Sequence, residues 1–281
     1  MKRLLLIEWL KLKHYRPFWV LSGLYVILIS AITIGVHFFF DFLKSKGADF
    51  QGFDPTMIPF YDFPDIWQNF TYIATWFKLF LAFIVVISIA NEANFRTLRQ
   101  NIIDGMSKKD WLLSKILLIL AMALIAAILL FVLGLINGFI FGHPDSYASA
   151  FNSIQFLFAY FLEVVTYLTF ALMITLVIRR PGIVIVGLMM YTLAFEPFLT
   201  LFLGNFPHHN YTDSTILPKI FQNIAPLFPI RALNNLIHVP FQRYVLQEIQ
   251  DYVSLKEVLI VLGWLILNIS TCYWLLKRRD L

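Results

Sequence analysis

Three ionisable side chains lie inside long apolar stretches and are the first candidates for chemistry: Lys78, Glu163 and Glu196. A charge in a hydrocarbon layer is costly to bury, so such residues pair, line a water-filled cavity or mark a transport path. At the helical rise of about 1.5 Å per residue, all three fall about 12 to 16 Å from the outer ends of their stretches. We therefore predict an intramembrane charge cluster in which Lys78 pairs with Glu163 or Glu196. The alternative is that Lys78 snorkels toward the lipid headgroups.

Histidines are the candidates for metal binding. His208, His209 and His238 lie in one polar segment with Asp213, and imidazole and carboxylate groups are zinc ligands. Their scattered spacing favours solvated loop residues over a metal site. The single cysteine, Cys272, lies inside the last apolar stretch and has no partner in the chain for a disulfide. We expect no metal site in this chain.

The sequence has no phosphate-binding loop of the Gly-x4-Gly-Lys-Ser/Thr type, since none of its 12 glycines occupies the required position. A net charge of +5 could indicate nucleic-acid binding, but the basic residues flank apolar stretches of membrane length. Topology and anionic headgroups explain that excess. We expect no nucleic-acid partner and no catalytic or cofactor site. If ATP drives the protein, ATP and Mg²⁺ are bound by another chain.

The elements that carry these residues are membrane-spanning helices. With 59% hydrophobic and 14% charged residues, the 281-residue chain is far too apolar for a soluble domain of its length. Six apolar stretches are each long enough to cross a hydrocarbon core of about 30 Å. They cover residues 18–41, 68–92, 115–142, 152–178, 182–204 and 256–276. We predict an all-α polytopic membrane protein in which residues 1–281 form a single transmembrane domain.

The distribution of basic residues sets the orientation. Of the 22 Lys and Arg residues, 15 fall on the face that holds both termini. Cytoplasmic loops carry such an excess, so we expect both termini in the cytoplasm and the chain in the cytoplasmic (inner) membrane. Residues 1–17 alternate basic and apolar side chains, which predicts an interfacial helix separated from the first span by Pro17.

Two longer connections lie on the opposite face. Residues 42–67 are rich in Asp, Pro and aromatic residues, and we expect an ordered cap in which Tyr61, Phe63 and Trp67 anchor the chain at the interface. Residues 205–255 show helical spacing of apolar residues on both sides of Pro226 and Pro229, which predicts two short outer helices.

Residues 93–114 form a polar, basic interruption between the second and third spans, as a cytoplasmic loop does. An apolar strip at helical spacing predicts a short helix that includes Phe95, Leu98, Ile102 and Ile103. Gly105 is expected to end this helix. Ser107 is a candidate N-cap of the next helix, with Asp110 at the capping-box position. The result would be a compact docking element.

This segment resembles the loop between the second and third spans of permease subunits of type-2 ABC transporters. That loop runs Glu, basic-Thr-Leu-Arg, Gly-X-Ser-basic and Leu-Leu-X-X-Lys. The matching residues here are Glu92, Arg96-Thr97-Leu98-Arg99, Gly105-Met106-Ser107-Lys108 and Leu112-Leu113-Ser114-Lys115. The number of spans and the interfacial N-terminal segment are similar too, and the outer helices match those exporters in position only.

The resemblance implies a coupling helix that sits in a cleft of a separate ATP-hydrolysing subunit. It assigns this role to Glu92, Phe95, Arg96, Leu98, Arg99, Ile102, Gly105, Ser107 and Lys108. It further implies two copies of an ABC ATPase subunit, a second permease copy or homologue, a surrounding lipid bilayer, and ATP-driven export of an amphipathic substrate.

Three alternatives remain open. An ordinary basic loop would explain the charges of residues 93–114 but not the Gly-X-Ser-basic step. A non-transporting membrane scaffold is a second alternative. A third is a polytopic membrane enzyme such as a CAAX-type intramembrane protease, whose signature Glu92 and Arg96 faintly resemble, with His143 as a possible partner. At helical rise, Glu92 and His143 would lie about 40 Å apart, and Asn91 stands where that signature has its first Glu, so the sequence disfavours the enzyme.

Overall fold

The computed structural model describes residues 2–45, 59–94, 97–178, 180–204, 224–240 and 252–278, and these ranges contain helices and no strand. The first half comprises α1 (Lys2–Lys13), α2 (Arg16–Ser45), α3 (Asp65–Thr75), α4 (Lys78–Asn94), α5 (Thr97–Ile103) and α6 (Lys108–Phe141). The second half comprises η2 (Pro144–Ser149), α7 (Gln155–Ile178), α8 (Pro181–Met190), η3 (Tyr191–Phe195), α9 (Glu196–Gly204), η4 (Ala225–Leu227), α11 (Pro229–Asn234) and α13 (Leu255–Arg278).

Five helical segments are long and apolar enough to cross a membrane: α2, α6, α7, the run Pro181–Thr200 through α8 and η3, and α13. The bent pair α3 and α4 makes a sixth if it forms one span. The chain is therefore an all-α polytopic membrane protein, as its hydropathy predicts.

The stretch predicted as one straight span over residues 68–92 starts earlier and is broken. α3 begins at Asp65, and α3 and α4 meet at an angle of 44°. The break contains neither proline nor glycine. Instead the Trp76 and Phe77 N–H groups donate to carbonyls three residues back, at 3.2 and 3.0 Å, which tightens the helix locally.

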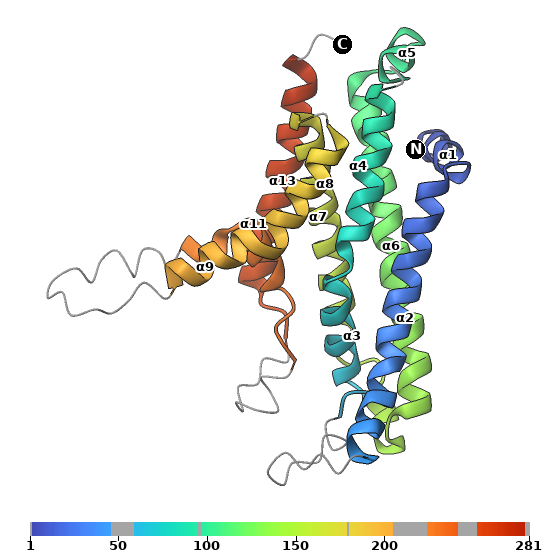
Figure 1. Ribbon diagram of the computed structural model, residues 1–281, viewed down its shortest axis with the longest axis vertical. Coiled ribbons are helices and arrows are strands. Elements are labelled where there is room, and N and C mark those ends of the chain that lie inside the picture. The colour runs from blue at the N-terminus through green and yellow to red at the C-terminus, as the bar shows by residue number, and fades with distance from the viewer. Residues whose placement is uncertain are drawn as a thin grey trace, which may run out of the picture.

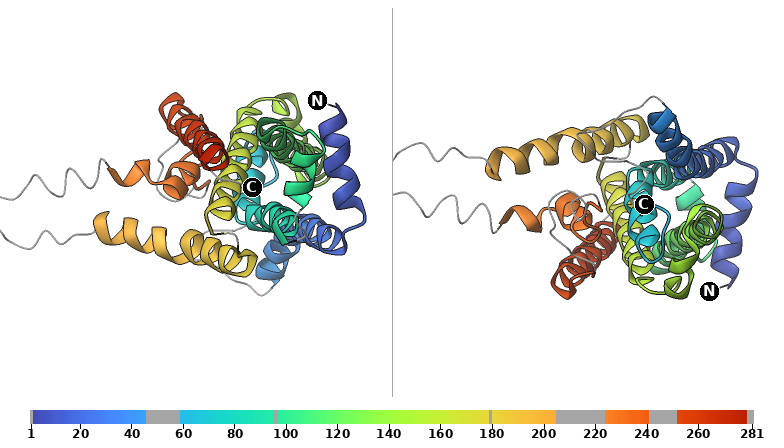
Figure 2. Two further views of the ribbon diagram at one scale, coloured as in Figure 1. Left: turned by 90° about the horizontal axis from the view of Figure 1, so that it is seen from above. Right: turned by 90° about the horizontal axis from the view of Figure 1, so that it is seen from below.

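The helix α7 is the centre of the bundle. Of the most apolar part of α7, 67% is buried inside the protein, against 17% for the equivalent parts of α2 and α13. It contacts α3, α4, α6, α8 and α13. Figure 2 shows this arrangement along the bundle axis, with α8, η3 and α9 forming a rod that leaves the bundle.

Aromatic residues just before α3 and in its first turn pack into the bundle instead of anchoring it at the interface. Tyr61, Phe63 and Trp67 are all buried, so the interfacial role predicted for them is wrong. They are held by α6, where a glycine leaves room for a ring: a Cβ added to Gly134 would lie 2.5 Å from Trp67 Cζ3. The Trp67 indole N–H donates to the Ala150 carbonyl at 2.8 Å, which satisfies its one polar group.

One end of the bundle carries α1, α5 and the last turn of α13 (Figure 1). α1 ends at Lys13 and α2 already begins at Arg16, so Pro17 lies in the first turn of α2 and does not separate the helices as predicted. A proline is tolerated there because the N–H groups of a first helical turn have no helical acceptor.

The predicted outer segment 205–255 is described in part. Residues 205–223 and 241–251 lie outside the described residues, and with them the first of the two expected helices. The second corresponds to η4 and α11, with Ile230, Ala232 and Leu233 buried against the bundle. The Trp264 indole N–H of α13 donates to the Leu227 carbonyl at 2.9 Å and ties η4 to the last span.

Candidate functional site

The end of the bundle that carries α5 has the local structure that its sequence predicts. Gly105 has a φ of +96°, and the Met106 N–H donates to the Asn101 carbonyl at 2.9 Å, which is the Schellman arrangement that closes a helix. The Ser107 hydroxyl accepts the Asp110 N–H at 3.1 Å and caps α6. α5 is thus a short helix held between a glycine stop and a capped span.

The residues predicted to couple to an ATPase lie along this end. Glu92 lies in the last turns of α4, and Lys108 begins α6. Phe95 and Arg96 lie outside the described residues, as do the side chains of Leu98, Arg99 and Ile102, whose backbone forms α5. The neighbouring Ile103 is 70% exposed, so at least one apolar side chain of α5 faces outward.

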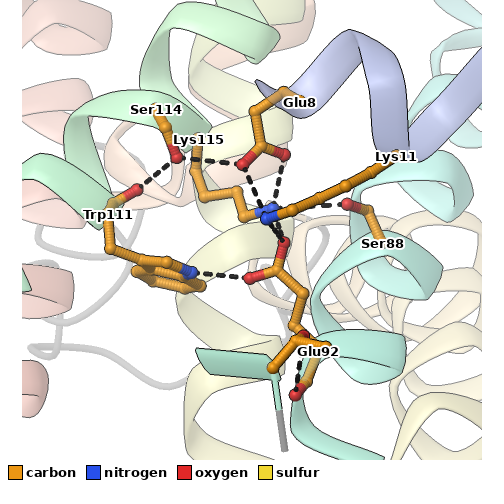
Figure 3. Close-up of polar contacts among 8 residues, drawn as sticks. Glu8, Lys11, Ser88, Glu92, Trp111, Ser114 and Lys115 are labelled. Atoms are coloured by element: carbon orange, nitrogen blue, oxygen red, sulfur yellow. Dashed lines mark hydrogen bonds and ion pairs between the residues drawn. The ribbon is translucent and has the colours of Figure 1, made fainter. Parts of the chain in front are cut away.

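Beneath α5, four charged side chains from three helices form a closed charge ring (Figure 3). Lys115 of α6 contacts Glu8 of α1 and Glu92 of α4, each at 2.6 Å. Lys11 of α1 contacts the same two carboxylates, Glu92 at 2.8 Å and Glu8 at 3.5 Å. Two cations and two anions alternate, so the ring is neutral and each charge has two opposite neighbours.

The charge ring is buried. Glu8 and Lys115 are each 1% exposed and Glu92 is 4% exposed. Burial is tolerated because polar groups complete the coordination: the Trp111 indole N–H donates to Glu92 at 2.6 Å, and the Ser114 hydroxyl donates to Glu8 at 3.0 Å. Removing one member of such a pair leaves an uncompensated charge and costs about 3–5 kcal/mol.

Lys11 is the most accessible member of the charge ring. Burial alone would lower the pKa of its ammonium group, but the carboxylates of Glu92 and Glu8 outweigh that effect and hold the pKa above its ordinary value. Lys11 therefore stays protonated at neutral pH, and the ring keeps its charge balance. α1 is fixed to the ends of α4 and α6 by this balance.

Glu92 and Lys115 belong to the loop motif, but no motif marks their partners Glu8 and Lys11. Lys11 was interpreted only as one of the basic residues of the amphipathic N-terminal segment, and Glu8 was given no role. One signal could have singled out Glu8: it is the only acidic residue among the first 40. A lone carboxylate in a basic segment beside a membrane calls for a cationic partner, but sequence spacing does not say which one.

The second charged site lies about 21 Å further along α4, which is the length of 14 helical residues. Here Lys78 of α4 contacts Glu163 of α7 at 2.5 Å, and both are buried. The Thr75 hydroxyl at the end of α3 donates to the other oxygen of Glu163 at 2.9 Å. One carboxylate therefore holds both sides of the break between α3 and α4.

Glu196, the third member of the predicted cluster, does not join this pair. Its carboxylate accepts the backbone N–H of Arg231 at 2.6 Å and so connects α9 to α11. Equal depth in the membrane was not enough to bring Glu196 to Lys78, because α9 lies on the rod that leaves the bundle (Figure 2). Lys78 contacts the Asn234 side chain instead, at 3.5 Å.

The contacts of the remaining candidates leave the protease signature without a common site. Glu92 is engaged by the charge ring, whereas His143 lies beyond the far end of α6 and contacts Asp62 at 3.0 Å. Among the described residues there is no group of three His, Cys, Asp or Glu side chains that could hold a metal ion. His238 lies 3.6 Å from Glu257, while His208, His209 and Asp213 lie outside the described residues.

Comparison with known proteins shows that a protein-family model matches most of the chain. The family model described as "ABC-2 family transporter protein" matches residues 68–276, which include every described helix from α4 to α9 and most of α13. The comparison with curated proteins gives no match.

Proposed function

The chain belongs to the ABC-2 family of transporter proteins and is a membrane subunit of a transporter, and we propose that it couples ATP hydrolysis by a separate ATPase subunit to export. The family assigns the membrane part of the task to this chain. The complete transporter in this proposal contains two ATPase subunits, which bind ATP and Mg²⁺, and a second permease copy or homologue.

The charge ring is the observation that supports coupling most directly. α5 lies on the short connection between Glu92 and Lys115, which contact each other across the base of that connection at 2.6 Å. A force on α5 therefore acts on two spans that are already fixed to one another and to α1. A loose loop would bend under the same force and transmit little of it.

In the proposed conformational change, movement of α5 is transmitted to α4 and α6. Closure of the ATPase pair pushes α5 as a lever, and packed helices with discrete arrangements carry the shift along their length. α4 leads to the break at residues 76–77, where Glu163 holds both helix ends. The break is the place where a shift of α4 can change the angle of α3.

The proposed orientation has both termini in the cytoplasm of a cell whose inner membrane holds the transporter. It is supported by the excess of Lys and Arg on the face that carries α1, α5 and the end of α13 (Figure 1). In this orientation α5 meets the ATPase, and the Lys78–Glu163 pair lies in the outer half of the membrane.

The test is co-purification of a tagged chain with an ABC ATPase encoded beside it. We expect Leu98→Asp, which puts a charge into the apolar strip, and Arg99→Glu, which reverses a docking charge, each to lower recovery of the ATPase at least about tenfold, a loss of about 1.4 kcal/mol or more. Asp104→Asn, at an exposed position next to α5, is the matched control and should change nothing. Full recovery with both α5 variants would contradict the proposal.

A further inference from the structure

A cavity of about 370 Å³ lies between the bent pair α3 and α4 and the rod that contains η3. One wall is the break between α3 and α4, with Trp76 and Lys78, and the opposite wall includes Leu193 of the π-helical turn η3. The third wall is α11. Single π-helical turns are frequently found at functional sites, and the volume falls within the range of small-molecule pockets, about 300–1,000 Å³.

The charged groups that line this cavity are cationic. Lys78 and Arg231 carry the formal charges among its described lining residues. The charge of Lys78 is balanced by the buried Glu163, whereas the Arg231 side chain is exposed and Glu196 accepts only its backbone N–H. Burial and the charge of Arg231 lower the pKa of His238, so this lining imidazole is neutral at pH 7. The cavity therefore presents positive charge to a ligand.

The neutral polar groups can also donate. The ammonium of Lys78 has no lone pair, so the Asn234 side chain must present its oxygen to Lys78, and its two N–H donors remain for a ligand. Asn235 lines the same wall and adds a second amide. Donors that converge from a lysine, an arginine and two amides match an anionic oxygen group such as a phosphate or carboxylate.

The other half of the cavity is apolar and open. Trp76, in the break between α3 and α4, is 59% exposed, and Leu193, in the span Pro181–Thr200, is 48% exposed. An alkyl chain could lie on these two side chains while its head reaches Lys78 and Arg231. A free anion would leave that apolar surface uncovered.

We propose that this cavity binds an amphiphile with an anionic head, which Lys78, Arg231 and the Asn234 amide hold, and an apolar chain, which packs on Trp76 and Leu193. The inference rests on the proposed function in so far as the amphiphile is the cargo. The anionic head could belong to a phospholipid of the bilayer or to a transported amphiphile, and both present the same chemistry to the cavity.

Binding is measured on the purified chain, without an ATPase, in phosphatidylcholine nanodiscs. The probes are dodecyl phosphate, dodecyltrimethylammonium, which has the same chain and the opposite charge, and inorganic phosphate, which has the head alone. We expect dodecyl phosphate to bind at least about tenfold more tightly than the other two probes. Dodecyltrimethylammonium loses the contacts of the anionic head, and inorganic phosphate loses the contacts of the alkyl chain.

Arg231→Gln isolates the cationic contact. The side chain is exposed and Glu196 accepts only the backbone N–H, so the substitution keeps that bond and the fold. It should weaken dodecyl phosphate binding about tenfold, the size of one charge-assisted hydrogen bond, and Arg231→Lys should recover part of the loss. Arg180→Gln, at an exposed arginine at the start of α8, is the matched control and should bind as the unmodified chain does.

Equal binding of the two amphiphiles, unchanged binding by Arg231→Gln, or competition by inorganic phosphate at the same concentration would overturn the inference. If phosphatidylglycerol added to the nanodisc competes with dodecyl phosphate, the ligand is a bilayer phospholipid. If dodecyl phosphate binds tightly and phosphatidylglycerol does not compete, the ligand is a transported amphiphile. Since no ATPase is present, failure here leaves the proposed coupling intact. Failure of the ATPase co-purification in turn leaves this binding result intact.

Discussion

At the scale of single residues, buried charges do most to fix how the helices meet. The charge ring and the Lys78–Glu163 pair both join helices that are far apart in the sequence, and all of their side chains except Lys11 are almost fully buried. A buried pair contributes little net stability over an apolar substitute, but breaking it by removing one partner is strongly destabilising. A double substitution that removes both partners should therefore cost less stability than a single substitution that removes one.

In the charge ring, Lys115→Met should lower the free energy of unfolding by about 3–5 kcal/mol, because Glu8 and Glu92 then share only Lys11. The double variant Lys115→Met with Glu8→Gln keeps the Lys11–Glu92 pair and restores neutrality, so it should recover part of the loss. Denaturant unfolding in detergent measures both. Strictly additive losses would mean that Lys115 and Glu8 do not interact.

The same design applies to the second site. Lys78→Met alone leaves Glu163 buried with only the Thr75 hydroxyl, and we expect a loss of about 3–5 kcal/mol in thermal or denaturant unfolding. Adding Glu163→Gln removes the stranded charge and keeps an acceptor for Thr75, so the double variant should be more stable than Lys78→Met. A double variant as unstable as the sum of the two single variants would refute the pairing.

Among the helices, some boundaries can be predicted from the local sequence, whereas other features depend on packing between distant residues. The glycine stop at Gly105 and the cap at Ser107 follow from backbone conformation and one hydrogen bond, so they are readable from the sequence. The break at Trp76 and Phe77 is not, because no proline or glycine marks it, and the contacts beside it, from Thr75 and Lys78 to Glu163 of α7, join residues far apart in the sequence. The burial of Trp67 was missed for the same reason: its pocket is made by Gly134, far away in the sequence.

Close packing of α3 on α6 predicts different results for two glycine substitutions. Gly134→Ala places a methyl group 2.5 Å from the Trp67 ring, which is fixed by its hydrogen bond to Ala150, so we expect a loss of about 1–3 kcal/mol. Gly263→Ala in α13 meets no atom within 4 Å and should be neutral or slightly stabilising. Thermal unfolding of both in the same detergent checks the difference, and equal behaviour would mean that Trp67 does not pack against α6.

At the scale of the whole molecule, the number of spans follows from hydropathy, because a hydrocarbon core admits only long apolar helices. The order in which those helices pack does not follow from it. α7 is central because the other spans bury their contacts against it, and hydropathy does not single it out, since α6 is more apolar but only half as buried. The candidate site divides in the same way: the loop motif led to Glu92 and Lys115, and only the fold added Glu8 and Lys11.

In the proposed coupling, the charge ring carries motion of α5 into the spans. This transmission is tested by spin labels on cysteines placed at Asp145 and Tyr252, two exposed positions at the end of the bundle opposite α5, in a Cys272→Ser chain. Pulsed electron paramagnetic resonance compares their distance in the ATPase complex with and without a non-hydrolysable ATP analogue. We predict that the analogue shifts this distance in the otherwise unmodified chain, and that Glu8→Gln abolishes the shift while the complex still binds the analogue. An unchanged shift in the Glu8→Gln complex would contradict the claim.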